Sequence, residues 1–198
     1  MTLYRLNLKL SQELFTIISC FEIALRNSID NHYTLMHGQE WLKNSVDKNG
    51  FFNNSKCHQT ANIIRKALRK LNSGYTHSKL IAEMDLGFWR YLFSQPQFYA
   101  GGQSLLKIFP AKPSSTPSIQ YNSRYVFNEL EKINKMRNRI AHHEPVCFKL
   151  GSAMIDTTYS KQKYRLIKDL FNWMLIDESA LLYGIDHVNQ IVRKIDEL

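Results

Sequence analysis

The stretch VFNELEKINKMRNRIAHHEP, residues 126–145, carries the pattern on which the fold assignment depends. Its apolar residues recur at intervals of three and four, which is the repeat of one face of an α-helix. Pro145 disfavours helical geometry at the residue before it and removes a backbone hydrogen-bond donor. The stretch therefore predicts an amphipathic helix that ends near His142 and His143.

The same helical spacing recurs along most of the chain, and we find no convincing strand and no internal repeat. Residues 95–120 differ, because they contain four of the five prolines and the pair Gly101-Gly102, which predicts a long loop. Helices are expected at about 10–36, 56–72, 78–94, 122–142 and 160–183, with a short one after them. The sequence therefore predicts an all-α fold, one domain over residues 1–198 built as a bundle of five to six helices.

Composition is typical of a folded globular protein, with 44% hydrophobic and 22% charged residues. No apolar run approaches the roughly 18 residues of a membrane-spanning helix, and the first residues lack the apolar core of a signal peptide. Cys20, Cys57 and Cys147 are too far apart to start a zinc site or a disulfide framework. We therefore expect a cytoplasmic protein with no membrane partner, no cofactor and reduced cysteines.

The net charge of +9 is unevenly distributed. Residues 48–128 contain eleven Lys and Arg against two Asp and Glu, so this segment carries the excess. Four of the basic residues lie close together on the expected second helix: Arg65, Lys66, Arg69 and Lys70. A one-sided field of this kind attracts polyanions such as RNA. The alternative is a solvated face on a basic helix.

The two arginines of RNR have different positions on the helix formed by residues 126–143. At about 100° per residue, Arg137 lies near the middle of the apolar stripe and Arg139 lies far outside it. Arg139 is therefore expected to be a solvent-side charge. Arg137 is expected to point inward, where it needs an anionic partner: either an acidic side chain in a structural ion pair or a phosphate.

On a continuous helix the side chain of His142 diverges from that of Arg137 by about 140° around the helix axis. Only a distorted last turn would bring the two side chains together. An imidazole exchanges protons near neutral pH and a guanidinium stabilises charge on a phosphoryl group, which makes the pair suitable for phosphate chemistry. A metal site formed by His142, His143 and Glu144 is not expected, because adjacent residues rarely converge on one ion.

Three stretches resemble the HEPN-type ribonucleases, in the form found in Abi-like proteins of bacterial abortive infection. These stretches are RNRIAHHEP (137–145), FEIALRNSI (21–29) and MDLGFWRYLF (84–93). The resemblance spans most of the chain and leaves the central loop uncovered. It implies a HEPN-like helical fold and a metal-independent endoribonuclease that acts in antiphage defence or as a toxin.

Carried onto this sequence, the resemblance implies that His142 is the general acid or base, Arg137 stabilises the transition-state phosphate and Asn138 orients the site. The 2′-hydroxyl would attack the neighbouring phosphorus. Because such sites generally combine two motifs, one copy in this chain implies a homodimer. RNA would be the substrate, and an antitoxin protein or a regulatory RNA would be a further partner.

Three auxiliary residues and one alternative function stay open. Glu22 and Arg26 form, with Asp30, an acid-base-acid series at intervals of four, which is either a surface ion-pair ladder or a set of contacts to the motif helix. His143 could assist or replace His142. The alternative function is a non-catalytic helical module that binds nucleic acid or senses an effector, with Arg137 as a structural charge.

Overall fold

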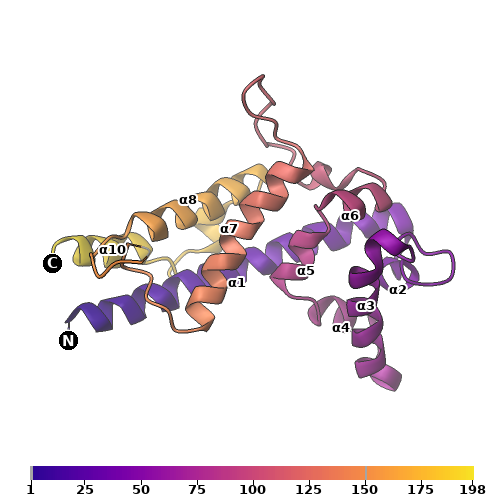
Figure 1. Cartoon of the computed structure of the whole chain (residues 1–198), viewed down its shortest axis with the longest axis horizontal. Helices are drawn as coiled ribbons and strands as arrows, with labels where there is room; N and C mark the ends of the chain where they lie inside the picture. Colours follow the sequence, from indigo (N-terminus) through magenta and orange to yellow (C-terminus); the bar gives the residue numbers. More distant parts are fainter. Residues whose placement is uncertain (1, 150) are drawn as a thin grey trace. The chain divides into compact units, whose positions relative to one another are not determined.

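The computed structural model describes residues 2–149 and 151–198, and within them the chain forms ten α-helices and three short 3-10 helices (Figure 1). Their only β pairing is an isolated bridge between Phe148 and Ile155. The prediction of an all-α fold is therefore confirmed. The α-helices are α1 (Thr2–His37), α2 (Trp41–Asn44), α3 (His58–Leu71), α4 (His77–Ala82), α5 (Leu86–Tyr91), α6 (Gln95–Ala100), α7 (Ser123–Ala141), α8 (Thr158–Trp173), α9 (Glu178–Leu181) and α10 (Val188–Asp196). The 3-10 helices are η1 (Ser55–Cys57), η2 (Asn72–Gly74) and η3 (Leu105–Ile108).

The chain divides into two compact units. Unit 1 contains residues 1–21 and 131–198, and unit 2 contains residues 22–130. The boundaries fall inside α1 and α7, so each of these two helices contributes to both units. None of the described helices is both long enough and apolar enough to cross a lipid bilayer.

The core of unit 1 is built from the apolar faces of α1, α7, α8 and α10 (Figure 1). Residues at helical spacing are fully buried on each face, and Phe21 meets Phe171 edge to face with ring centroids 5.4 Å apart. Such aromatic pairs add to the stabilisation from the buried area. The buried residues include Leu10, Leu14, Ile17, Ile133, Met136, Ile167, Leu170, Val188 and Ile195.

Unit 2 is organised around the carboxylate of Asp30. It accepts hydrogen bonds from the indole Nε1 of Trp41 at 2.7 Å and from Nε2 of His77 at 2.8 Å. The buried ring of Tyr33 packs on Trp41 with centroids 4.7 Å apart. Asp30 therefore ties α2 and α4 to α1. The predicted ion-pair ladder through Asp30 is wrong, because this carboxylate is directed to Trp41 and His77.

Two predicted helices are each interrupted. Residues 78–94 form α4 and α5, because the side chain of Asp85 accepts the N–H of Phe88 at 2.8 Å and starts a new helix. The segment 160–183 stops at Trp173, and Leu175 adopts a left-handed conformation with φ of 58°. Asp177 then caps α9 through the N–H of Ala180.

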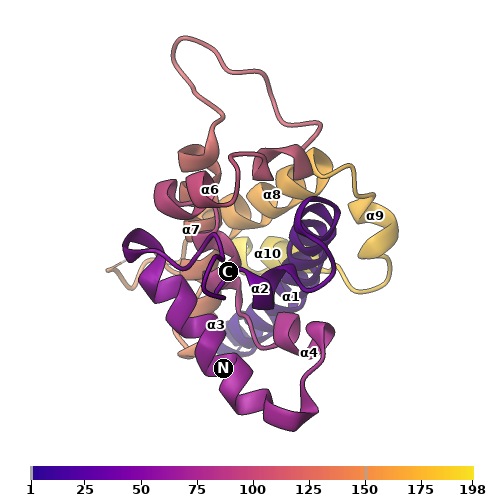
Figure 2. The same cartoon turned by 90° about the vertical axis from the view of Figure 1, so that its right-hand side faces the viewer.

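Only the second part of the predicted loop 95–120 is irregular. Pro96 lies in the first turn of α6, where its fixed φ favours a helix and its missing N–H costs nothing. Phe98, Leu105 and Ile108 bury their side chains, so α6 and η3 are part of the core of unit 2. From Phe109 to Asn122 the chain has no helix, and beyond the buried Phe109 it projects from its unit (Figure 2).

Replacement of Asp85 by Ala removes the side-chain cap of α5, the helix that contains the buried residues Phe88 and Trp89. We expect the free energy of unfolding to fall by about 1 kcal/mol. Denaturant unfolding of the wild type, Asp85→Ala and Asp85→Asn measures it. Asn keeps the capping acceptor, so Asp85→Asn should stay close to the wild type; equal losses in both variants would contradict the capping role.

Candidate functional site

The C-terminal end of α7 is closed by two backbone hydrogen bonds. The N–H of His143 donates to the carbonyl of Ile140 at 3.0 Å, and the N–H of Glu144 donates to the carbonyl of Arg139 at 2.9 Å. His143 has a φ of 58°. These are the features of a Schellman motif, in which a left-handed residue follows the helix. The predicted helix end near His142 and His143 is thus confirmed, with Ala141 as the last helical residue.

Arg139 holds this helix end in place. Its guanidinium donates to the carbonyl oxygen of Pro145 at 2.5 Å, pairs with Glu144 at 3.3 Å and lies over the ring of Tyr159 at 5.1 Å. Only 16% of its side chain is exposed, against 54% for Glu144. The prediction that Arg139 is a solvent-side charge is therefore wrong. The turn after α7 and the start of α8 cover a side chain that an isolated helix would leave in water.

Tyr159 lies beneath this guanidinium and remains a protonated phenol. Burial raises the pKa of Tyr159, although the nearby charge of Arg139 acts in the opposite direction. A neutral ring presents its negatively polarised face to a cation, and such contacts are stabilising when they are shielded from water. Sequence reasoning missed Tyr159, because it is far from RNR along the chain. The one available signal was that Tyr159 lies in the first turn of α8.

Arg137, Asn138 and His142 lie around the last turns of α7. Asn138 and His142 are exposed, whereas Arg137 is half-buried. The Arg137 guanidinium is 3.5 Å from Oδ1 of Asn138, a distance at the limit of a hydrogen bond. The N–H of His142 donates to the carbonyl of Asn138 at 2.9 Å, so the backbone keeps its helical direction up to His142. Within the described residues, no hydrogen bond joins the imidazole of His142 to Arg137.

Of the predicted auxiliary residues, Arg26 and Glu22 lie on α1 in unit 2, and both are half-buried. Nε of Arg26 is buried, and no described residue forms a hydrogen bond with it. His143 is exposed, and its backbone serves the Schellman motif. Among the described residues, no group of three His, Cys, Asp or Glu side chains is placed to hold a metal ion.

The four basic residues predicted to bind RNA on α3 are not equivalent. Arg65 donates to the carbonyl of Val46 at 2.9 Å and to Oδ1 of Asn53 at 2.7 Å, so it holds a loop of unit 2. Lys70 pairs with Glu83 at 2.6 Å. Lys66 and Arg69 are exposed. The row therefore offers a weaker field to a polyanion than its sequence indicates.

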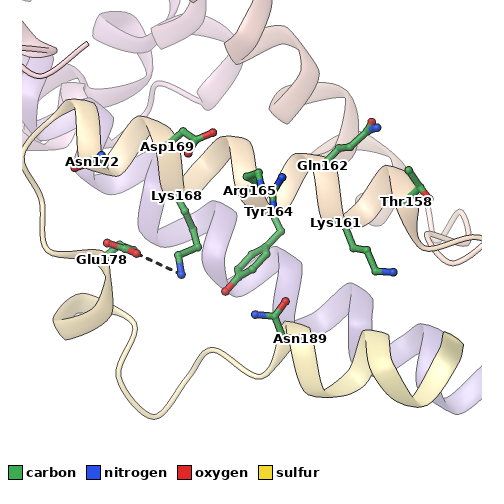
Figure 3. Close-up of a pocket in the computed structure, with 10 residues that line it drawn as sticks. All are labelled: Thr158, Lys161, Gln162, Tyr164, Arg165, Lys168, Asp169, Asn172, Glu178 and Asn189. Atoms are coloured by element: carbon green, nitrogen blue, oxygen red, sulfur yellow. Dashed lines mark ion pairs between the residues drawn. The ribbon is translucent and has the colours of Figure 1, made fainter. Parts of the chain in front are cut away.

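A hollow of unit 1 lies on α8 and has a volume of about 660 Å³ (Figure 3). Its basic side chains largely have partners, because Lys168 pairs with Glu178 at 3.3 Å and Lys161 pairs with Asp196 at 2.5 Å. Burial and a hydrogen bond to Asp186 raise the pKa of Tyr164, which keeps its phenol protonated. These contacts fix α9 and α10 on α8. The residues lining the hollow are Thr158, Lys161, Gln162, Tyr164, Arg165, Lys168, Asp169, Asn172, Glu178 and Asn189.

Replacement of Arg139 by Ala should lower the free energy of unfolding by about 1–3 kcal/mol, because the Pro145 carbonyl loses its charged donor and Tyr159 loses the cation above it. Glu144→Gln removes only the exposed partner and should cost less than about 1 kcal/mol. Urea unfolding of the two variants gives both values. Equal small losses would show that Arg139 is a surface charge after all.

His143→Gly should raise the free energy of unfolding by about 1 kcal/mol, because glycine adopts the left-handed conformation without a side-chain clash. His143→Ala keeps the clash and should leave stability nearly unchanged. Thermal unfolding of both variants compares them. A loss of stability in His143→Gly would indicate that the imidazole makes a contact that stabilises the fold.

Comparisons with known proteins identify the family of the chain. A family model described as "Abi-like protein" matches residues 1–147, which contain α1 to α7 and the motif at the end of α7. Neither a search of curated proteins nor a search of solved structures found a match. The match covers well over half of the 198 residues, and it indicates a role in abortive infection. The chain belongs to the Abi-like protein family.

Proposed function

We propose that this protein is a metal-independent endoribonuclease of the HEPN type that acts in antiphage abortive infection or as a toxin in the cytoplasm. The observation that carries the proposal is the difference in contacts between the two arginines at the end of α7. Arg139 is engaged by the helix-ending turn, whereas beside it Asn138 and His142 are exposed and the half-buried Arg137 has, among the described residues, only Asn138 as a neighbour at hydrogen-bonding distance. Membership of the Abi-like family supports the same biological role.

In the proposed reaction an RNA 2′-hydroxyl attacks the adjacent phosphorus. A base removes the 2′-hydroxyl proton as the new P–O bond forms, and the bond to the 5′-oxygen breaks as that oxygen takes a proton from an acid. The products are a 2′,3′-cyclic phosphate and a 5′-hydroxyl. His142 acts as acid or base, Arg137 stabilises the negative charge on the phosphorane, and Asn138 orients the phosphate. No step requires a metal ion.

The proposed reaction is better served by two chains than by one. An acid and a base are both needed, and His142 diverges from Arg137 by about 140° on the regular helix end that its backbone hydrogen bond maintains. We therefore propose a homodimer in which two motifs form one site, with Arg26 and Glu22 as auxiliary contacts and His143 as a substitute base. An antitoxin protein or a regulatory RNA would keep such an enzyme inactive until infection.

A second candidate function is favoured by the same helix end. Within the described residues the structure gives His142 and Arg137 no mutual hydrogen bond, as expected of a module that binds nucleic acid without cutting it. Such a module would bind RNA with a steep salt dependence and release no cleaved product.

His142→Ala and Arg137→Ala should each reduce RNA cleavage by at least about 100-fold, because general acid-base catalysis and charge stabilisation of the phosphorane are lost. Cleavage is measured on a labelled RNA in the presence of EDTA, with end-group analysis for the 2′,3′-cyclic phosphate. A substrate with a 2′-deoxy sugar at the cut position should resist cleavage.

His58→Ala and Arg165→Ala are the matched controls, because both residues are exposed and lie outside the motif. They should keep wild-type activity and stability. Cleavage that survives His142→Ala, or equal cutting of the deoxy substrate, would reject the mechanism. Binding without any cleavage by the wild type would favour the second candidate.

A further inference from the structure

Unit 2 contains two hollows that adjoin each other across α6. One has a volume of about 570 Å³ and is bordered by α6 and the first turns of α7. The other has a volume of about 600 Å³ and is bordered by α6 and η1. Gln95 and Tyr99 line both hollows. The two therefore form one groove, called the Tyr99 groove here, and each half is large enough for about one nucleotide.

The groove combines aromatic rings with positive charge. Tyr99 lies at the centre of the groove and is 56% exposed, and Phe98 and Phe127 line the side of the groove next to α7. Arg124 lies at the α7 end and Lys56 at the η1 end. None of the described lining residues is acidic, and among the described residues the structure records no ion pair for either cation.

Hydrogen bonds hold α6, the helix that carries Tyr99, in place. The buried amide of Gln97 donates to the hydroxyl of Thr60 at 3.0 Å and so ties α6 to α3. The hydroxyl of Ser94 donates to the other end of the same amide. The N–H of Gly101 closes the helix on the carbonyl of Gln97 at 2.8 Å. An exposed tyrosine on a braced helix loses little conformational freedom when a flat ligand stacks on it.

We propose that the Tyr99 groove binds single-stranded nucleic acid, with a base stacked on Tyr99 and the flanking phosphates near Lys56 and Arg124. Aromatic rings between basic side chains are the features by which proteins bind single strands without reading their sequence. The strand is RNA if the proposed function holds, and only that identification rests on it. Unit 2 supplies a favourable field, since its residues include thirteen Lys and Arg against seven Asp and Glu.

The groove fits this ligand better than the other basic surfaces do. On α3, Arg65 and Lys70 are engaged with Val46, Asn53 and Glu83. In the hollow on α8, Lys168 pairs with Glu178 (Figure 3) and Lys161 pairs with Asp196. Neither the described residues of α3 nor those that line the α8 hollow combine an exposed aromatic ring with cations that lack an ion pair, as the Tyr99 groove does.

The experiment measures fluorescence anisotropy of a labelled hexauridylate, with all variants made in the His142→Ala protein so that no substrate is cut. Tyr99→Ala should weaken binding by roughly five- to 150-fold through loss of stacking. Tyr99→Phe keeps the ring and should bind normally. Tyr183→Ala is the matched control, because Tyr183 is 88% exposed in unit 1. Lys56→Ala and Arg124→Ala should each reduce the slope of log affinity against log salt by about 0.7.

The proposal is overturned if Tyr99→Ala binds as the parent does, if only a Lys66→Ala/Arg69→Ala protein loses binding, or if the parent binds no hexauridylate. Displacement by uridine monophosphate as effective as by unlabelled hexauridylate would also overturn it, because one nucleotide would then fill the site. Cleavage by the wild type is assayed separately. If RNA binding depends on Tyr99 but the wild type cleaves no RNA, the proposed groove is supported and the proposed ribonuclease activity is rejected. If the wild type cleaves RNA but binding does not depend on Tyr99, the ribonuclease activity is supported and the groove is rejected.

Discussion

The contact between Arg139 and the turn that follows α7 is the constraint on which the candidate site depends. One guanidinium satisfies the carbonyl of Pro145, the carboxylate of Glu144 and the face of Tyr159. A cation shielded from water requires such partners, because an arginine cannot lose its charge. These contacts and the Schellman motif stop α7 at Ala141 and so fix the positions from which Arg137, Asn138 and His142 project.

The same principle separates the basic residues of this chain into two groups. Some have partners within the fold: Arg65 holds a loop, and Lys70, Lys161 and Lys168 each pair with an acidic side chain, although Lys70 and Lys161 remain exposed. Others are exposed and have no ion pair recorded among the described residues, including Lys56, Lys66, Arg69 and Arg124. Net charge counts both groups alike, whereas a phosphate chain interacts with the second group most strongly. Both cations of the Tyr99 groove, Lys56 and Arg124, belong to the second group.

The motif and the groove belong to different units of the chain. Arg137 and His142 are part of unit 1, whereas Tyr99, Lys56 and Arg124 are part of unit 2. The two proposals therefore make independent demands: one concerns acid-base chemistry on a phosphate, and the other concerns stacking and charge along a strand. Holding a substrate in place lowers the entropic cost of a reaction, so strand binding and acid-base chemistry are both useful to an endoribonuclease.

The sequence by itself determined the helical fold, the position of most helices and the end of α7. These follow from local rules, since apolar spacing and a proline act within a few residues. It did not determine the break at Asp85, the helix α6 that begins at Gln95 or the hydrogen-bond partners of Asp30. Tertiary structure alone decided that Arg139 is the structural arginine and that Tyr99 stands exposed between two cations, because both depend on residues that are distant in the chain and adjacent only after folding.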